Sequence, residues 1–386
     1  MKTKLFSILA ASALAFTACS DENTPGPIVK GEKDLIGNIE ANTTLDANIE
    51  YTMTGTVLVK SGATLTIPAG TTIKATAGGT NVYLLVEKGG KLIADGTADK
   101  PVIFTSAASA PKAGDWGGIL LNGNAPLSRA EGAKSDAATE ISTNIRFGGD
   151  DVADNSGKLN FVRIEYTGAR INNDAEHNGL TLNGVGNGTV LSNIVLTHGD
   201  DDAIEFFGGT VNASNILVIN CTDDMFDFSQ GYRGTVKNVY GIREAGYTAV
   251  TADPRGIEAD GNLDGKTPND INQSDFTVDG ITIVNNAPGK DANLTMHDVF
   301  KIRRGAKATI KNAFAKFGAG TTAVDLIDFN DDRGAGDAAS TIEYTIDPAN
   351  GLGDAKIKNP GNAKIEKKDG LKGADVSAFS WTGYKF

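Results

Sequence analysis

Short runs of alternating apolar and polar residues fill the chain from about residue 51 onward, for example at 56–59, 63–67, 71–74 and 91–94. Alternation with a period of two is typical of β-strands that bury one face. Steps rich in glycine and asparagine separate the runs, and a sustained helical period is scarce. The pattern therefore predicts an all-β protein made of many short strands.

The strands repeat along the chain with an offset of 22 residues. The segment 192–196 (SNIVL) recurs at 214–218 (SNILV), and residues 180–183 align with 204–207 after small insertions. The offset of 22 also relates the following pairs: Asp201 and Asp223, Asp202 and Asp224, Ile204 and Phe226, Glu205 and Asp227, Phe206 and Phe228. A repeat of this length without a helix predicts a β-helix, in which stacking buries what a single coil cannot.

The predicted fold is a single-stranded right-handed parallel β-helix of about 10–13 coils over residues 46–386. Long polar insertions interrupt it at 128–158, 253–275 and 329–340. We expect them to be loops, and loops of this length are often functional. The aromatic segment 379–384 is expected to cover the last coil, whose open edge would otherwise promote aggregation.

The N-terminus has the features of a secretory signal over residues 1–18, with Lys2 and Lys4 followed by a short apolar run. Small residues precede Cys19, and the arrangement resembles a bacterial lipobox, which implies lipidation of that cysteine. The acidic segment 20–23 resembles the surface-export signal of Bacteroidota lipoproteins. We therefore predict a lipidated linker at 19–45 and an outer-membrane lipoprotein exposed on the cell surface; the alternative is a plain signal peptide.

Charge narrows the range of partners. Without Lys2 and Lys4 the chain has 34 basic and 48 acidic residues, a net charge of −14. This balance disfavours nucleic acid and favours cations or neutral partners such as many glycans. The outer membrane, through the lipid, and a glycan or outer-membrane protein are the expected partners. Lipidation of Cys19 would leave Cys221 without a disulfide partner, and its apolar neighbours predict burial.

Stacked acids form the candidate metal site. Adjacent coils would place carboxylates roughly 4.8 Å apart, where they repel one another. The residues concerned are Asp201, Asp202, Glu205, Asp223, Asp224 and Asp227. Three interpretations stay open: a calcium ion, whose preferred ligands are such oxygens; aspartates that merely suit turns; and an acid catalyst.

A second candidate site is a strip for ligand binding. Phe207 and Asn183 would lie outward on adjacent coils, and an aromatic ring beside polar groups suits a sugar. Packing of Phe207 under an insertion is the alternative. Arg255 and Arg303 are the basic residues that could join this strip or serve an enzyme.

The predicted fold resembles the pectin-lyase-like superfamily, whose lyases use Ca²⁺ with a basic residue and whose hydrolases carry an aspartate pair, Gly-His-Gly and Arg-Ile-Lys. Here His198-Gly199 precedes the acids instead of following them, and residues 301–303 read Lys-Ile-Arg. No catalytic residue is assigned because of these departures.

Three further motifs are more specific. The segments 115–119 (DWGGI), 178–186 (NGLTLNGVG) and 202–209 (DAIEFFGG) resemble an uncharacterised family of Bacteroidota surface lipoproteins over nearly the whole chain. This resemblance implies the fold and the location more than an activity.

Three functions remain in view. The leading hypothesis is a non-catalytic surface module that binds a glycan or a partner outer-membrane protein, or acts as a scaffold. The alternatives are a lyase or hydrolase of an acidic polysaccharide, and a structural adhesin or surface-layer component.

Overall fold

The computed structural model describes residues 34–171, 176–248, 251–288, 296–347 and 356–386. The signal peptide, Cys19 and most of the predicted linker lie outside the described residues. Within the described ranges, no helix has the length and apolar character needed to cross a membrane.

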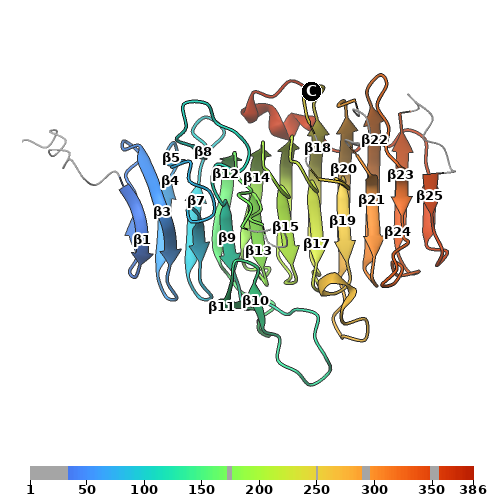
Figure 1. The fold of residues 1–386 in the computed structure, drawn as a ribbon, viewed down its shortest axis with the longest axis horizontal. Helices are drawn as coiled ribbons and strands as arrows, with labels where there is room; N and C mark the ends of the chain where they lie inside the picture. Colours follow the sequence, from blue (N-terminus) through green and yellow to red (C-terminus); the bar gives the residue numbers. More distant parts are fainter. Residues whose placement is uncertain (1–33, 172–175, 249–250, 289–295, 348–355) are drawn as a thin grey trace, which may run out of the picture. The chain divides into compact units, whose positions relative to one another are not determined.

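The chain forms a right-handed parallel β-helix, which confirms the predicted fold. Its strands stand side by side in sequence order (Figure 1). One ladder comprises β1 (Asp34–Ile39), β3 (Tyr51–Val59), β6 (Leu84–Val86), β9 (Ile119–Asn122), β13 (Leu180–Asn183), β15 (Ile204–Phe207), β17 (Phe226–Ser229), β19 (Ile257–Asp260), β21 (Asp298–Arg303), β23 (Asp325–Asp328) and β25 (Ile357–Lys358). These eleven rungs in the described residues fall within the predicted 10–13 coils.

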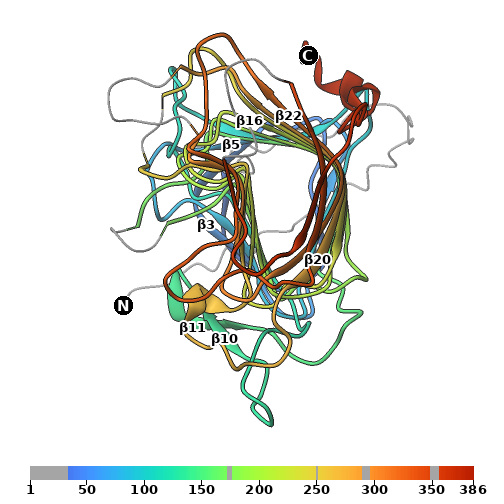
Figure 2. The same ribbon diagram turned by 90° about the vertical axis from the view of Figure 1, so that its right-hand side faces the viewer.

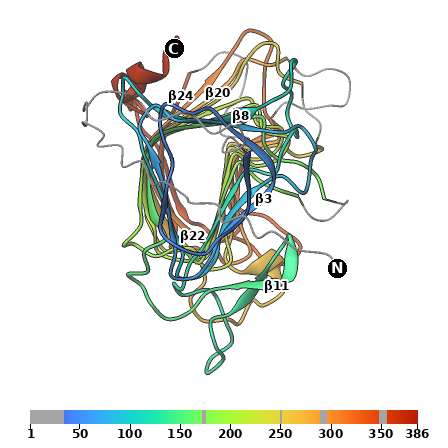
Figure 3. The same cartoon turned by 90° about the vertical axis from the view of Figure 1, so that its left-hand side faces the viewer.

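A second ladder forms another wall of the β-helix. It comprises β2 (Thr43–Thr44), β4 (Thr64–Pro68), β7 (Lys91–Asp95), β12 (Gly157–Glu165), β14 (Val190–Thr197), β16 (Asn212–Ile219), β18 (Thr235–Arg243), β20 (Asp275–Asn285), β22 (Lys307–Phe317), β24 (Thr341–Ile346) and β26 (Lys364–Lys367). A third wall begins with the first residues of β1 and β3, passes through β5 (Thr72–Ala75) and β8 (Val102–Ser106), and continues in the second halves of the long strands from β12 onward. Figure 2 and Figure 3 view these walls from the two ends of the stack.

The predicted register holds residue by residue. Ser192 pairs with Ser214 and Phe206 with Phe228, each 22 residues apart. Like residues consequently stack inside the coils: the rings of Phe206 and Phe228 are fully buried, with centroids 5.1 Å apart. Such stacking supplies the apolar burial that one coil cannot make alone.

Asparagines turn the corner between the second and third walls. Asn193, Asn215 and Asn238 have positive φ angles of 53°, 55° and 55°, which asparagine tolerates better than most residues. Their side-chain amides also bond from coil to coil, with N–O distances of 2.9 Å from Asn215 to Asn193 and 2.8 Å from Asn238 to Asn215. The ladder of amides satisfies polar groups at a corner that has no sheet partner.

The β-helix begins earlier than predicted. Strands β1 and β2 lie within the segment 34–45, which was assigned to the linker, and they pair in parallel with β3 and β4. The segment has too few apolar residues to be recognised by alternation alone. Cys221 is free and buried as expected, and burial raises its pKa to about 12.

The C-terminal segment does not cover the last coil, so that prediction was wrong. The 3₁₀ helix η3 (Val376–Thr382) lies instead beside β14 and β16 (Figure 1). Phe379 is fully buried there, against a side-wall cluster that includes Leu217 and Tyr240. These strands carry apolar residues on both faces, and the outward ones need a cover.

Candidate functional site

One outer register position of the first ladder carries a polar or charged side chain in every strand from β13 to β25. In strand order the residues are Thr181, Glu205, Asp227, Glu258, Lys301, Asp328 and Lys358. Side chains alternate along a strand, and the neighbours Ile204 and Phe206 are fully buried in the core. Glu205 therefore points outward from the coil, on the same side of the strand as Phe207.

This outer face is nevertheless covered, which corrects the expectation of an exposed strip. Glu205 and Asp227 are only 7% and 8% exposed. The insertion with the hairpin β10 (Ala137–Thr139) and β11 (Ser142–Phe147) lies on this side, as does the one with η1 (Leu263–Gly265) (Figure 2). Reciprocal backbone hydrogen bonds between Arg129 and Ile271 join the two insertions.

Phe207 and Asn183 are therefore not available to a ligand from the surface. Phe207 is 4% exposed and packs against Leu127, which directly precedes the first insertion, and against Phe147 within it. The ring centroids of Phe147 and Phe207 are 6.4 Å apart. Asn183 is also buried, and its side-chain amide donates to Asn122 over 2.8 Å. The alternative interpretation of Phe207, packing under an insertion, describes this geometry.

Three carboxylates in the N-terminal half of the face form what we call the unpaired acid cluster: Asp202, Glu205 and Asp227. One oxygen from each lies within 4.8 Å of the others, and no Lys or Arg of the described residues forms an ion pair with them. Burial, and after it the charge of Asp227, raises the pKa of Glu205 well above its usual value. Burial and then Asp224 do the same for Asp202. At an effective dielectric constant of about 20, two such charges repel by roughly 3 kcal/mol.

The acid pair Asp201 and Asp223 extends this region by one register position. Together with Asp202 it brings three carboxylate oxygens within 4.8 Å of one another. The pKa of Asp201 is raised well above normal by burial and then by Asp223, with Arg170 as a partial offset. Of the predicted metal residues, the structure thus brings together all six, because Asp224 lies within the same distance limit of Asp227.

The C-terminal half of the same face has its own cations, and we call it the ion-paired cluster. It comprises Glu258, Asp260, Asp298, Asp325 and Asp328 with Arg255, Lys301, Arg303 and Lys358. Arg255 contacts Glu258 over 2.5 Å, and both Asp224 and Asp298 over 3.4 Å. Lysines form the ion pairs of the last strands. The ammonium group of Lys301 lies 2.7 Å from Asp328, and that of Lys358 lies 2.7 Å from Asp325.

These ion pairs decide what Arg255 and Arg303 can do. Arg303 holds Glu258 over 2.6 Å and Asp260 over 2.7 Å, and both arginine side chains are largely buried. Although burial opposes it, the carboxylates of Asp224 and Glu258 raise the pKa of Arg255 above its already high value. A guanidinium held this way keeps its proton and does not suit the role of general base. The two arginines are structural counter-charges in this fold.

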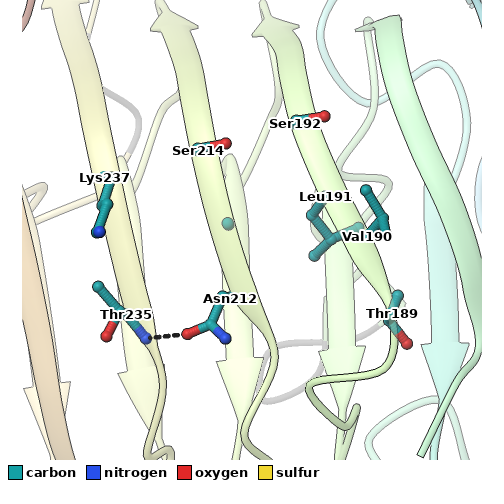
Figure 4. A pocket seen from close by; sticks show the side chains of 9 residues that line it. Thr189, Val190, Leu191, Ser192, Asn212, Ser214, Thr235 and Lys237 are labelled. Atoms are coloured by element: carbon teal, nitrogen blue, oxygen red, sulfur yellow. Dashed lines mark hydrogen bonds between the residues drawn. The ribbon is translucent and has the colours of Figure 1, made fainter.

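An open groove lies elsewhere, on the outer side of β14, β16 and β18 (Figure 4). Its volume is about 620 Å³. It is lined by Thr189, Val190, Leu191, Ser192, Asn212, Ala213, Ser214, Thr235 and Lys237. A hydroxyl group recurs here on two successive coils, since Ser192 pairs with Ser214, and the next residue in the same register is Lys237. The alternating pattern of these short strands does not distinguish an open groove from an ordinary polar surface, so the groove could not be predicted from the sequence.

A second cleft of about 470 Å³ borders the ion-paired cluster and is lined by His297, Lys301, Asp328, Asn330, Asp331, Asp332 and Lys358. Its ammonium groups are already engaged with carboxylates. The cleft is therefore less available to a charged ligand than its composition suggests.

Comparison with known proteins gives one match. The family described as the pectate-lyase-like β-helix domain matches residues 37–359. No curated protein and no solved structure matches the chain significantly.

Proposed function

Because this chain belongs to the pectate-lyase-like β-helix family over residues 37–359, we propose that it is a non-catalytic glycan-binding protein of the cell surface. The family fits a glycan-related role. In the proposal the groove over β14, β16 and β18 holds the glycan, and a lipid on Cys19 anchors the chain to the outer membrane. The alternatives are a polysaccharide-cleaving enzyme and a surface scaffold for a partner protein.

The proposal rests on a difference between two outer surfaces of the β-helix. One is the outer face of the first ladder, which carries the acids and arginines, and the other is the groove over β14, β16 and β18. Most of the acids and arginines that could support cleavage are buried under insertions or held in ion pairs, which limits their contact with a polysaccharide. The groove, by contrast, is open and lined by groups that form hydrogen bonds. Binding without cleavage is the function that this arrangement supports best.

The groove also has the chemistry that a sugar chain requires. Ser192 and Ser214 present hydroxyls on successive rungs, and the exposed Val190, 46% accessible, offers apolar contact beside them. Directional polar groups near an apolar surface are typical of ligand sites. Rungs spaced by roughly 4.8 Å let an extended polymer meet similar groups repeatedly. Lys237 adds a positive charge at one end, which favours a glycan with acidic groups.

The test is a binding screen of the purified protein against neutral and acidic polysaccharides, read by isothermal calorimetry. Lys237→Ala should weaken binding of the best acidic glycan about tenfold, through loss of one charged contact. Lys100→Ala is the matched control, because Lys100 is also exposed but lines a different cleft. Equal weakening in both variants, or no binding by the native protein, would contradict the groove.

A cleavage assay with the same polysaccharides distinguishes a binding protein from an enzyme. Incubation with and without Ca²⁺ should leave their chain lengths unchanged, as measured by size-exclusion chromatography. Depolymerisation that is lost in Asp224→Asn would favour the enzymatic alternative.

The lipid anchor has an independent test in cells. Cys19→Ser should abolish incorporation of labelled palmitate and release the protein from the membrane fraction. Retention of the label in that variant would refute the assignment of Cys19.

A further inference from the structure

The unpaired acid cluster lacks a counter-charge although its side chains are buried. Asp202 Oδ1 accepts a hydrogen bond from the backbone N–H of Asp224 over 2.8 Å, and Glu205 Oε2 accepts one from Asn178 over 2.5 Å. These neutral donors do not cancel three charges. Burying unpaired carboxylates is costly, and folded proteins offset it with a cation or a proton.

Asp227 provides a second and independent indication. Its side chain is 8% exposed, and its Oδ1 atom has no hydrogen-bond partner among the described residues. A carboxylate oxygen of Asp227 lies within 4.8 Å of ligand oxygens of both Asp202 and Glu205. A buried carboxylate oxygen that has no hydrogen-bond partner, on a side chain that lies among other carboxylates, marks a place where a ligand could bind.

The ion-paired cluster shows how the same protein balances acids elsewhere. Asp298, Asp325 and Asp328 also bring three carboxylate oxygens within 4.8 Å. There Lys358 contacts both Asp325 and Asp328, and Arg255 contacts Asp298. In the corresponding space beside Glu205 and Asp227, the described residues place no ammonium or guanidinium group within ion-pairing distance.

We propose that Asp202, Glu205 and Asp227 bind a calcium ion that does for this half of the face what arginine and lysine do for the other half. Calcium accepts several carboxylates in flexible geometry, whereas magnesium prefers to keep its waters and a strict octahedron. A compact, buried set of acids on a rigid sheet therefore favours calcium. Asp201 and Asp223, one register position away, are close enough to share in the coordination through Asp202.

The ion has a structural role in this proposal. The insertion that packs Phe147 on Phe207 lies over this face, and its Glu140 is close enough to raise the pKa of Glu205 further. The low exposure of Glu205 and Asp227 limits the contact that a polysaccharide could make with an ion in that position. Calcium would relieve the repulsion beneath the insertion and hold the insertion closed, a role separate from glycan binding in the groove.

The experiment uses the full-length purified protein and measures bound metal and thermal stability together. After dialysis against buffer with calcium, elemental analysis should find at least one Ca²⁺ per chain. A Ca²⁺ concentration 100 times Kd should raise Tm by about 4 °C over the value in EDTA, and the same concentration of Mg²⁺ should give a smaller shift. Absence of bound calcium, or equal Tm values in EDTA and calcium, would overturn the proposal.

Two variants locate the ion. Asp227→Asn should lose the calcium-induced shift, and in EDTA its Tm should equal or exceed the native value, because one repulsive charge is gone. Asp325→Asn is the matched control in the ion-paired cluster: its Tm should fall, but its calcium-induced shift should persist. A full calcium response in Asp227→Asn would overturn the assignment. If that variant does not fold, Glu205→Gln replaces it with the same expected results.

Discussion

Two halves of one sheet face carry similar numbers of buried acids and balance them differently. In the C-terminal half, Arg255 and Arg303 hold Glu258 between them, at 2.5 and 2.6 Å. In the N-terminal half, Glu205 and Asp227 occupy the same register position with no such partner among the described residues. The comparison shows that stacking acids on successive strands does not by itself determine how their charges are balanced. The balance depends on whether the neighbouring strands contribute arginine or lysine side chains.

The largest expected effect follows from removing the central cation of the ion-paired cluster. Arg255→Met should lower the free energy of unfolding by about 3–5 kcal/mol, because it leaves Asp224, Glu258 and Asp298 buried with fewer counter-charges. Urea titration measures the loss. Arg146→Met is the control: the Arg146–Asp136 pair is exposed, and its loss should cost less than about 1 kcal/mol. Equal losses of unfolding free energy in the two variants would mean that the buried ion pairs stabilise the protein no more than the exposed pair does.

A matched pair of substitutions compares the two halves directly. In EDTA, Glu258→Gln should destabilise the protein by about 2–3 kcal/mol, because two buried guanidinium groups lose a partner. Glu205→Gln should leave stability unchanged or raise it by about 1 kcal/mol, since it removes a repulsive charge and keeps an acceptor for Asn178. Both values come from urea titrations under one condition. Losses of the same sign and size would mean that the halves do not differ.

The smallest effect is expected at the end of the ion-paired cluster. Lys358 is 46% exposed in its side chain, so solvent already screens its pairs with Asp325 and Asp328. Lys358→Ala should therefore cost about 1 kcal/mol or less, measured by the same titration. If Lys358→Ala lowered the free energy of unfolding as much as Arg255→Met, solvent exposure would not determine how much these ion pairs contribute to stability.

The fold could be predicted because its register is visible in the sequence. From Ser192 to Gly231 the coils are of constant length, so equivalent residues recur at a fixed offset and inward side chains can be recognised by kind. The first coil at 34–45 was missed because it lacks this regularity. The position of residues 376–382 was also missed, because nothing local in an aromatic segment indicates which distant apolar surface it covers.

The site could be predicted only where the offset stays at 22. Glu205 and Asp227 align that way, but Glu258 follows Asp227 by 31 residues and Lys301 follows Glu258 by 43, because insertions lengthen those coils. The partners of Arg255 and Arg303 were therefore hidden. Exposure was also beyond prediction, because the insertion that buries Phe207 has no periodic pattern from which its docking could be inferred.

The most direct measurement is an anomalous difference map from a crystal of the protein in which Tb³⁺ replaces Ca²⁺. The map should show one strong peak within coordination distance of Asp202, Glu205 and Asp227, and none among Asp298, Asp325 and Asp328, where lysine and arginine already supply the charge. A map without the first peak, or with peaks of equal height at both positions, would contradict the account.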